Sequence, residues 1–290
     1  MTRDWIAAGE EDEYLIDYLF DLHGYIIIKG AIAPDDLAAA NRWVDEHQEY
    51  VRGKRGGSSV EGVWIGNVET HTYSDADGCN FQNIIEGGLV FRRLINYPSW
   101  IGHCRRWINP VNRISLHENL LNVRGLGGYI GIHCGGACAI SYLTFRQANT
   151  GEWMVGQVNV IGALQDVGPG DGATTVIPGS HKSAIRHPQL TEVAYRSDAA
   201  AGEQVGMQEV YLKAGDVLLL TDALTHGSAA RTNAGYRRIT LYRYSGGLLR
   251  SRFNYQPSEA LLAAMDEEQR LIVQPMPPRR PPTEPEPAAG

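Results

Sequence analysis

The chain has 290 residues, of which 43% are hydrophobic, and a formal net charge of −7. This length suits one large β-rich domain, and the acidic balance argues against a groove for nucleic acid, which would be basic. No stretch approaches the roughly 18 apolar residues of a membrane span, and the N-terminus lacks the pattern of a secretory signal. The cysteines, Cys79, Cys104, Cys134 and Cys138, lack disulfide-scaffold spacing. We therefore expect a cytoplasmic protein with reduced thiols.

The first hundred residues predict helices around one strand. Residues 11–22 have the amphipathic pattern of a helix, and the apolar run Tyr25–Lys29 predicts a strand. Pro34, followed by two aspartates, predicts the start of a second helix. Residues 98–107 predict another short helix, and residues 53–60 predict a Gly-rich loop.

From about residue 114, short runs rich in β-branched and aromatic residues alternate with Gly-rich turns. The expected strands are residues 115–123, 129–133, 139–146, 156–166, 173–177, 208–212, 216–221 and 237–244. Their spacing predicts a mainly β (α+β) fold with flanking N-terminal helices and a double-stranded β-helix (jelly-roll) core at 114–246. A helix is expected at 258–270. We expect one domain over residues 1–273 and a disordered, Pro-rich tail at 274–290.

Three segments stand out: GYIGIHCGG (128–136), DVGPGDGATTVIPGSHKS (166–183) and GDVLLLTDALTHGSAARTNAGYRR (215–238), of which PGSHKS and the stretch from His226 to Arg237 are the most specific. In these segments the chain resembles the phytanoyl-CoA dioxygenase family of iron(II)- and 2-oxoglutarate-dependent enzymes. The resemblance implies iron(II), 2-oxoglutarate and O2 as cofactors, with His133 and His226 as the iron ligands. It also implies that Arg237 and Ser228 bind 2-oxoglutarate and that Asn119 fills another position of the co-substrate site.

The chemistry of these side chains agrees with that assignment. Iron(II) oxygenases hold the metal through two neutral imidazoles and one carboxylate on one face. Alternation along an extended strand predicts that positions 133 and 135 face the barrel interior and that Cys134 faces away. Arginine suits the far carboxylate of 2-oxoglutarate because its planar guanidinium can pair with both oxygens. His181 and a Cys134–Cys138 zinc pair are the alternative metal candidates.

The third iron ligand is missing from the motif, because Gly135 stands where the resembled family has Asp. Asp222 precedes His226 by four residues, which spans about 13 Å on an extended strand, so it is not expected to replace the carboxylate. Glu118 should face the side opposite to Asn119 and is not expected to replace it either. Aliphatic halogenases that resemble this family show the same replacement, and chloride occupies their vacant position. The resemblance therefore implies chloride beside Gly135 and halogenation of an unactivated carbon.

Arginines near the predicted mouth of the barrel suggest a small anionic substrate: Arg124, Arg146, Arg243 and Arg250. His117, on the preceding strand, could also line the site. Among halogenases on this scaffold, the resemblance is to those that act on adenine nucleotides in nucleoside-antibiotic biosynthesis, which implies the 2′ carbon of a deoxynucleotide such as dAMP. Two alternatives stay open: a hydroxylase of a small metabolite, with water in place of chloride, and a non-catalytic jelly-roll binding protein.

Overall fold

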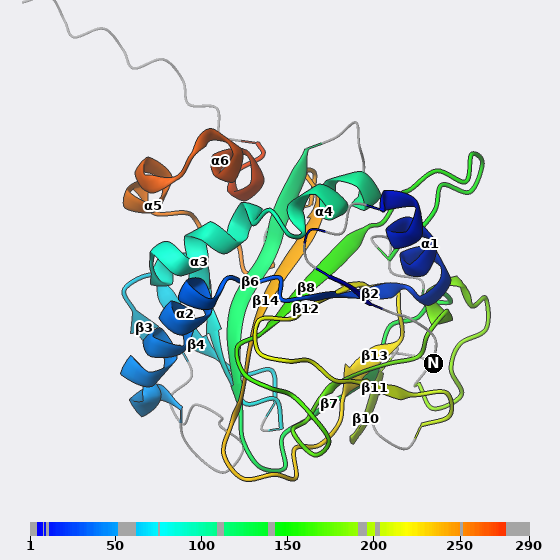
Figure 1. Ribbon diagram of the computed structural model, residues 1–290, viewed down its shortest axis with the longest axis horizontal. Helices are drawn as coiled ribbons and strands as arrows, with labels where there is room; N and C mark the ends of the chain where they lie inside the picture. Colours follow the sequence, from blue (N-terminus) through cyan, green and yellow to red (C-terminus); the bar gives the residue numbers. More distant parts are fainter. Residues whose placement is uncertain are drawn as a thin grey trace, which may run out of the picture.

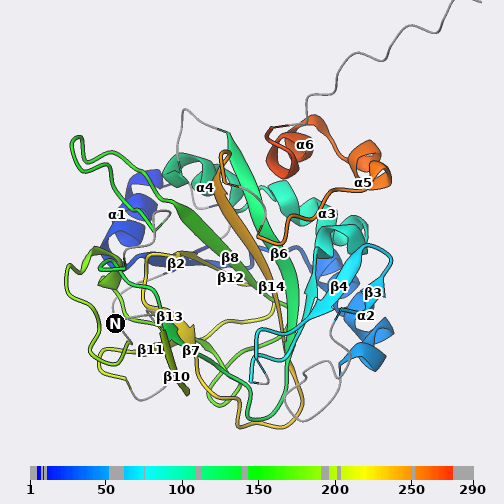
Figure 2. The same cartoon turned by 180° about the vertical axis from the view of Figure 1, so that it is seen from behind.

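The computed structural model describes residues 5–7, 9, 12–51, 62–74, 76–108, 113–138, 143–190, 196–200 (backbone), 204–249 and 252–276. In this part of the chain two β-sheets face each other, and helices cover the outer side of the larger sheet (Figure 1). Figure 2 shows the same layers from behind. This is the jelly-roll architecture with flanking N-terminal helices that the strand spacing predicts.

The larger sheet has nine strands in the order β1-β2-β12-β8-β14-β6-β5-β4-β3. Their bounds are β1 Trp5–Ala7, β2 Tyr25–Lys29, β12 Val217–Thr221, β8 Gln157–Ala163, β14 Arg237–Gly246, β6 Ile114–Arg124, β5 Cys79–Gln82, β4 Val68–His71 and β3 Trp64–Ile65. The smaller sheet has the order β10-β7-β13-β9-β11. Its strands are β10 Arg196–Ala200, β7 Ile130–His133, β13 His226–Ser228, β9 Thr174–Val176 and β11 Gln208–Val210.

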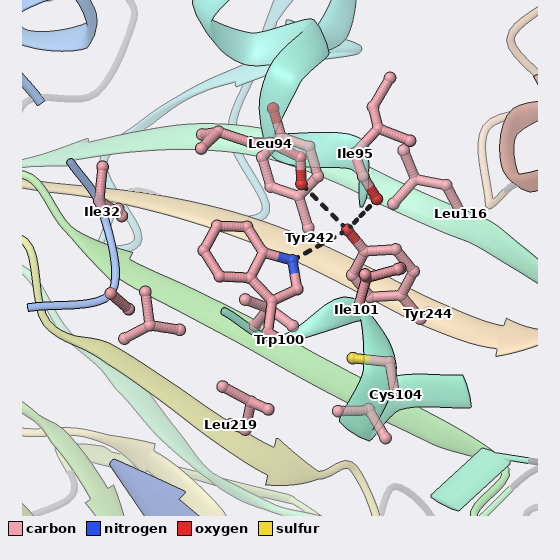
Figure 3. Close-up of a cluster of buried hydrophobic side chains, with 14 of the residues drawn as sticks. Ile32, Leu94, Ile95, Trp100, Ile101, Cys104, Leu116, Leu219, Tyr242 and Tyr244 are labelled. Atoms are coloured by element: carbon pink, nitrogen blue, oxygen red, sulfur yellow. Dashed lines mark hydrogen bonds between the residues drawn. The ribbon is translucent and has the colours of Figure 1, made fainter. Parts of the chain in front are cut away.

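The helices pack on the outer face of the larger sheet. They are α1 Glu13–His23, α2 Pro34–Glu46, α3 Leu89–Arg93, α4 Ile101–Ile108, α5 Glu259–Ala264 and α6 Glu267–Val273, with 3-10 turns at Gln48–Tyr50, Ile84–Gly87, Leu94–Asn96 and Ser180–Lys182. Figure 3 shows the core beneath α3 and α4, where the Tyr244 hydroxyl lies 2.8 Å from the Ile95 carbonyl and also accepts from Trp100 Nε1. No helix among the described residues is long and apolar enough to cross a membrane.

Alternation along the central strands divides the side chains between two cores. On β12, Val217 and Leu219 pack toward the helices, whereas Leu218 and Leu220 pack between the sheets. On β14, Tyr242 faces the helices, and odd-numbered residues such as Ile239 face the smaller sheet. The space between the sheets therefore receives every second residue of β6, β8, β12 and β14. This inner face of the larger sheet forms one side of the candidate site.

Most elements expected from the sequence are present within a few residues. The strands that were not predicted are β1, β3, β4, β5, β10 and β13, all short. The expected helix at 258–270 is two helices, because the first ends at Ala264 and the second begins after its capping residue Asp266. Of the expected strand at 139–146, residues 143–146 form no strand, and the rest lies outside the described residues. The expected loop at 53–60 and the tail from residue 277 also lie outside them.

Candidate active site

Two histidines from neighbouring strands of the smaller sheet form the centre of the site. His133 ends β7 and His226 begins β13; they are direct antiparallel partners, and their ring centroids are 4.1 Å apart. Their Nδ1 atoms lie 3.0 Å from the Gly131 carbonyl and 2.7 Å from the Leu224 carbonyl. Because a carbonyl only accepts, each Nδ1 carries the proton and each Nε2 keeps a lone pair for a metal.

Burial favours the neutral form of both imidazoles. Burial lowers the pKa of His133 to about 3, and the neighbouring His226 contributes in the same direction. Burial likewise lowers the pKa of His226. Neutral imidazoles are the form that binds a metal, so the pair matches the two-histidine part of a non-haem iron site.

The chain leaves the strand directly after His133, which moves Cys134 into the site. Cys134 has a φ of 63°, in the left-handed region, so the alternation of an extended strand stops there. Its Sγ and the ligand nitrogens of His133 and His226 all lie within 4.8 Å of one another. The prediction that Cys134 faces away is therefore wrong. Burial and the Asp222 carboxylate raise the pKa of the thiol well above its usual range.

Gly135 also has a positive φ, of 121°. A Cβ atom at this position would lie 2.7 Å from Thr225 Oγ1. The Thr225 side chain therefore occupies the space into which a residue at position 135 would begin to project. A halide beside Gly135 stays a prediction, and the structure adds a hydroxyl group as its neighbour.

Asp222 lies close to the histidines because the chain turns between β12 and β13. The Leu224 N–H donates to the Thr221 carbonyl at 3.0 Å and closes this turn. Asp222 Oδ1 is consequently 3.7 Å from His226 Nε2, far less than the extended-chain distance expected from the sequence. Asp222 is buried, and Oδ1 accepts a hydrogen bond from Asn159 Nδ2 at 2.8 Å. Burial raises the pKa of Asp222, but Arg243 and the two histidines outweigh it and the net shift is downward.

Arg237 begins β14 and points into the space between the sheets, with 2% of the residue exposed. Its Nη1 donates to the Gly172 carbonyl, and its Nη2 donates to Asn122 Oδ1 at 3.0 Å. Its Nε is buried without a hydrogen-bond partner among the described residues. A buried guanidinium with an unused donor fits a carboxylate ligand such as that of 2-oxoglutarate. Burial and Arg124 lower the pKa of Arg237.

Arg124 and Ser228 lie next to Arg237. Arg124 is buried, and its Nη2 is 3.0 Å from Asp77 Oδ1. Its Nη1 donates to Ser228 Oγ, which also accepts from the Ile130 N–H at 2.8 Å. Arg124 is therefore not exposed at the barrel mouth, and its role in binding a substrate stays a prediction. Neither Asp77 nor Asn122 was singled out from the sequence.

Asn119 lies on the other face of β6. Its Oδ1 accepts from the Ile85 N–H at 3.0 Å, at the start of a 3-10 turn on the helix side of the sheet. The expectation that Asn119 contacts 2-oxoglutarate is therefore wrong. Successive residues of a strand point to opposite faces, so Asn122, three positions after Asn119, lies on the inner face instead.

A second polar cluster faces inward further along β14. Arg243 Nη1 lies 3.0 Å from Glu118 Oε2, and Arg252 Nη1 lies 3.4 Å from the same oxygen. Glu118 Oε1 accepts from the Tyr73 hydroxyl and from Gln82 Nε2. Glu118 does face away from Asn119, as predicted, but into the space between the sheets. Arg243 Nε is a further buried nitrogen without a hydrogen-bond partner among the described residues, so its role in substrate binding stays a prediction.

Arg146 and His181 make contacts of the kind that structural residues make. Arg146 pairs with Asp21 at 2.8 Å and lies over the Trp153 ring, so it attaches a loop to α1 and does not serve the site. His181 Nε2 lies 3.1 Å from the Asp21 carbonyl, and its ring packs on Phe145, as expected for a structural residue. His117 is the extra residue of a bulge in β6, and its substrate role stays a prediction. Arg250 lies outside the described residues.

Comparisons with known proteins agree with this geometry. The family model for phytanoyl-CoA dioxygenase (PhyH) matches residues 142–239, a segment that includes His226 and Arg237 but does not reach His133. The crystal structure of HygX from Streptomyces hygroscopicus with nickel, 2-oxoglutarate and hygromycin B bound superimposes with a TM-score of 0.62 and 20% identity, covering 81% of this chain and 87% of that one. No curated protein matches by sequence.

A second similar structure is that of the epimerase SnoN in complex with Fe3+, α-ketoglutarate and nogalamycin RO. It gives a TM-score of 0.55 and 17% identity, covering 81% of this chain and 85% of that one. At these identities the superpositions establish the fold. The matched segment and the fold agree on one class of protein, the non-haem, 2-oxoglutarate-dependent enzymes.

Proposed function

We propose that this protein is an iron(II)- and 2-oxoglutarate-dependent enzyme that oxidises an aliphatic C–H bond of a small molecule. The observation that carries the proposal is the pair His133 and His226, whose Nε2 atoms both keep a lone pair. The donor set fits iron, because two neutral imidazoles lie together in a buried setting, with the Cys134 thiol within 4.8 Å of them and the Asp222 carboxylate 3.7 Å from His226 Nε2. When bound, the iron would supply activation of O2, with 2-oxoglutarate as the co-reductant.

Other residues of the chain would bind and orient 2-oxoglutarate. Arg237 would hold the far carboxylate of 2-oxoglutarate through its unused Nε–H, and Asn122 keeps the guanidinium in place. Arg124 and Ser228 complete the positive wall of the same pocket. The burial of these groups excludes water from the co-substrate and so strengthens its ionic contacts.

A specific observation favours chlorination as a second candidate function. Gly135 stands where the resembled family has its iron-binding Asp, which would leave a coordination position for chloride. In this candidate the substrate is an anionic nucleotide, with dAMP as the first compound to test. Three arginines expected to bind its phosphate already face a carboxylate: Arg124 faces Asp77, Arg146 faces Asp21, and Arg243 faces Glu118. A phosphate would compete with these ion pairs, which argues for a less highly charged small molecule.

The proposal is tested on the purified protein without oxygen. Adding iron(II) and then 2-oxoglutarate should produce a visible charge-transfer band, and His226→Ala should remove it, because one imidazole ligand is lost. Absence of the band in the unsubstituted protein would contradict the proposal and leave the non-catalytic binding protein. Chloride that shifts the band saturably would favour the second candidate, followed by mass analysis of dAMP products.

A further inference from the structure

We propose that Asp222 is the carboxylate ligand of the metal and takes the role that the motif leaves vacant at Gly135. The inference rests on the iron site of the proposed function and specifies its third ligand. It replaces a residue of the loop that follows β7 by a residue of the turn between β12 and β13.

The backbone of β12 aims Asp222 at the histidines. Leu218 and Leu220 face the space between the sheets, and Asp222, two residues further, continues on this inner face. Asp222 also stays anchored to the larger sheet, because its N–H donates to the Gln157 carbonyl at 3.0 Å. The turn then carries the chain to His226 on the smaller sheet. Asp222 and His226 thus face each other across the interior although they are four positions apart.

The donor atoms of Asp222 and His226 are nearly at ligand spacing, whereas the group of ligand atoms that lie within 4.8 Å of one another consists of His133, Cys134 and His226, so binding would draw Asp222 closer to His133. Two donors that each lie about 2 Å from one metal at a right angle are about 3 Å apart. Asp222 Oδ1 and His226 Nε2 are 3.7 Å apart, so a closing of less than about 1 Å brings them to this spacing. The hydrogen bond from Asn159 Nδ2 uses one lone pair of Oδ1 and leaves another. Asn159 therefore orients the carboxylate in the way that outer residues orient metal ligands.

Cys134 is the competing third ligand, because its Sγ lies within 4.8 Å of the ligand nitrogens of both histidines. Oxygen ligands suit iron(II) oxygenases, whereas a thiolate selects softer metals. The Cys134 Sγ is 4.0 Å from Asp222 Oδ2, so the thiol also stands as a weak donor to this carboxylate. The ligand preference of iron(II) therefore makes Cys134 a neighbour of the third ligand, although its thiol lies closer to both histidines as a group.

The assignment changes the expected reaction. With Asp222 on the metal, three protein ligands leave open positions for 2-oxoglutarate and O2, as in the facial triad of hydroxylating oxygenases. No position then remains for chloride. The inference therefore favours hydroxylation or a related oxidation over chlorination.

Metal binding itself provides the test. Cobalt(II) is titrated into the metal-free protein and followed by calorimetry and absorption, in the unsubstituted protein, Asp222→Asn and Cys134→Ser. Loss of an outer partner of a metal ligand costs about 10–100-fold in affinity, so loss of a direct ligand should weaken binding by on the order of 100-fold or more. Asp222→Asn should show this loss, and Cys134→Ser should bind within a few fold of the unsubstituted protein.

Three other outcomes would overturn the assignment of Asp222, and one of them would also overturn the proposed function. Unchanged affinity in Asp222→Asn, with the unsubstituted protein binding cobalt, overturns the ligand assignment alone. A near-ultraviolet thiolate-to-cobalt band in the unsubstituted protein assigns Cys134 instead, and this measurement does not depend on any variant folding. Failure of the unsubstituted protein to bind cobalt or iron would overturn the proposed function together with this inference.

Discussion

Arg124 and Arg237 are direct cross-strand partners on β6 and β14, and both are almost fully buried. Like charges directly opposite each other destabilise a sheet, and burial increases the cost of each charge. Asp77, 3.0 Å from Arg124, offsets one of the two positive charges. Arg237 makes hydrogen bonds to neutral acceptors and retains one unused N–H. The pair therefore carries an excess positive charge that a bound anion would neutralise.

Arg237→Ala should weaken 2-oxoglutarate binding strongly. Truncating one partner of a buried charge pair costs about 2–5 kcal/mol, which corresponds to a loss of at least about 30-fold in affinity. The measurement is a titration of 2-oxoglutarate into the iron(II) protein, read from the charge-transfer band. Arg238→Ala is the matched control, because Arg238 points to the helix side and pairs with Asp45. Equal affinities in the two variants would contradict the pocket assignment.

Asp77→Asn should destabilise the metal-free protein. Arg124 would then be a buried guanidinium without its counter-charge beside Arg237, and breaking a buried ion pair costs about 3–5 kcal/mol. Urea denaturation provides the free energy of unfolding. Adding 2-oxoglutarate should recover part of the lost stability, because the ligand supplies negative charge to the same pocket. No loss of stability would show that Asp77 does not compensate the arginine pair.

Asn119 and Asn122 provide a test of which face of β6 lines the site. Asn122→Ala should weaken 2-oxoglutarate binding by about tenfold, because Arg237 loses a hydrogen bond to its charged group. Asn119→Ala should leave this affinity unchanged and lower stability by about 1 kcal/mol, because the Ile85 N–H loses its acceptor. The reverse pattern, measured by the same titration and urea series, would restore Asn119 to the co-substrate site.

The family resemblance singled out His226, Ser228 and Arg237, whose roles stay predictions. His226, Ser228 and Arg237 lie in one stretch whose spacing reflects the short strand β13 and the start of β14. The assignment of Asn119 to the co-substrate site was wrong because Asn119 and Asn122 are asparagines on one strand, an odd number of positions apart. A single residue of register reverses the face, and residue types alone did not distinguish the two.

The other errors have a common cause, since both lie where a strand ends. Cys134 follows β7 in a left-handed conformation that few residue types other than glycine favour, so alternation could not place its thiol. Asp222 follows β12 in a turn that crosses from one sheet to the other. The sequence TDALTH contains no Gly or Pro to indicate this turn. A distance calculated for an extended chain therefore failed there.

Acid should destabilise the metal-free protein partly through His103. Burial and the neighbouring Arg106 lower its pKa to about 4, although Asp17 and Glu13 act in the opposite direction. In the unfolded chain its pKa is near 6.5, so between about pH 6.5 and 4 the unfolded state binds a proton that the folded state does not. As the pH is lowered through this window, the free energy of unfolding should decrease by up to about 1.4 kcal/mol per pH unit because of this group. In urea denaturation at about pH 7.5 and pH 5, His103→Gln should lose less stability on acidification; an equal loss would contradict this assignment.

A vacant position beside Gly135 and a metal-bound Asp222 predict opposite responses of the charge-transfer band to chloride. If Asp222 occupies the third position, the charge-transfer band of the unsubstituted protein should not respond to chloride, and Asp222→Ala should make it respond, because a position opens. If chloride binds beside Gly135, the unsubstituted protein should respond and Gly135→Asp should abolish the response. Gly135→Asp carries a structural cost of about 1–3 kcal/mol, from its positive φ and from the contact with Thr225 Oγ1. Gly135→Ala is therefore its control, since it shares the strain and adds no carboxylate.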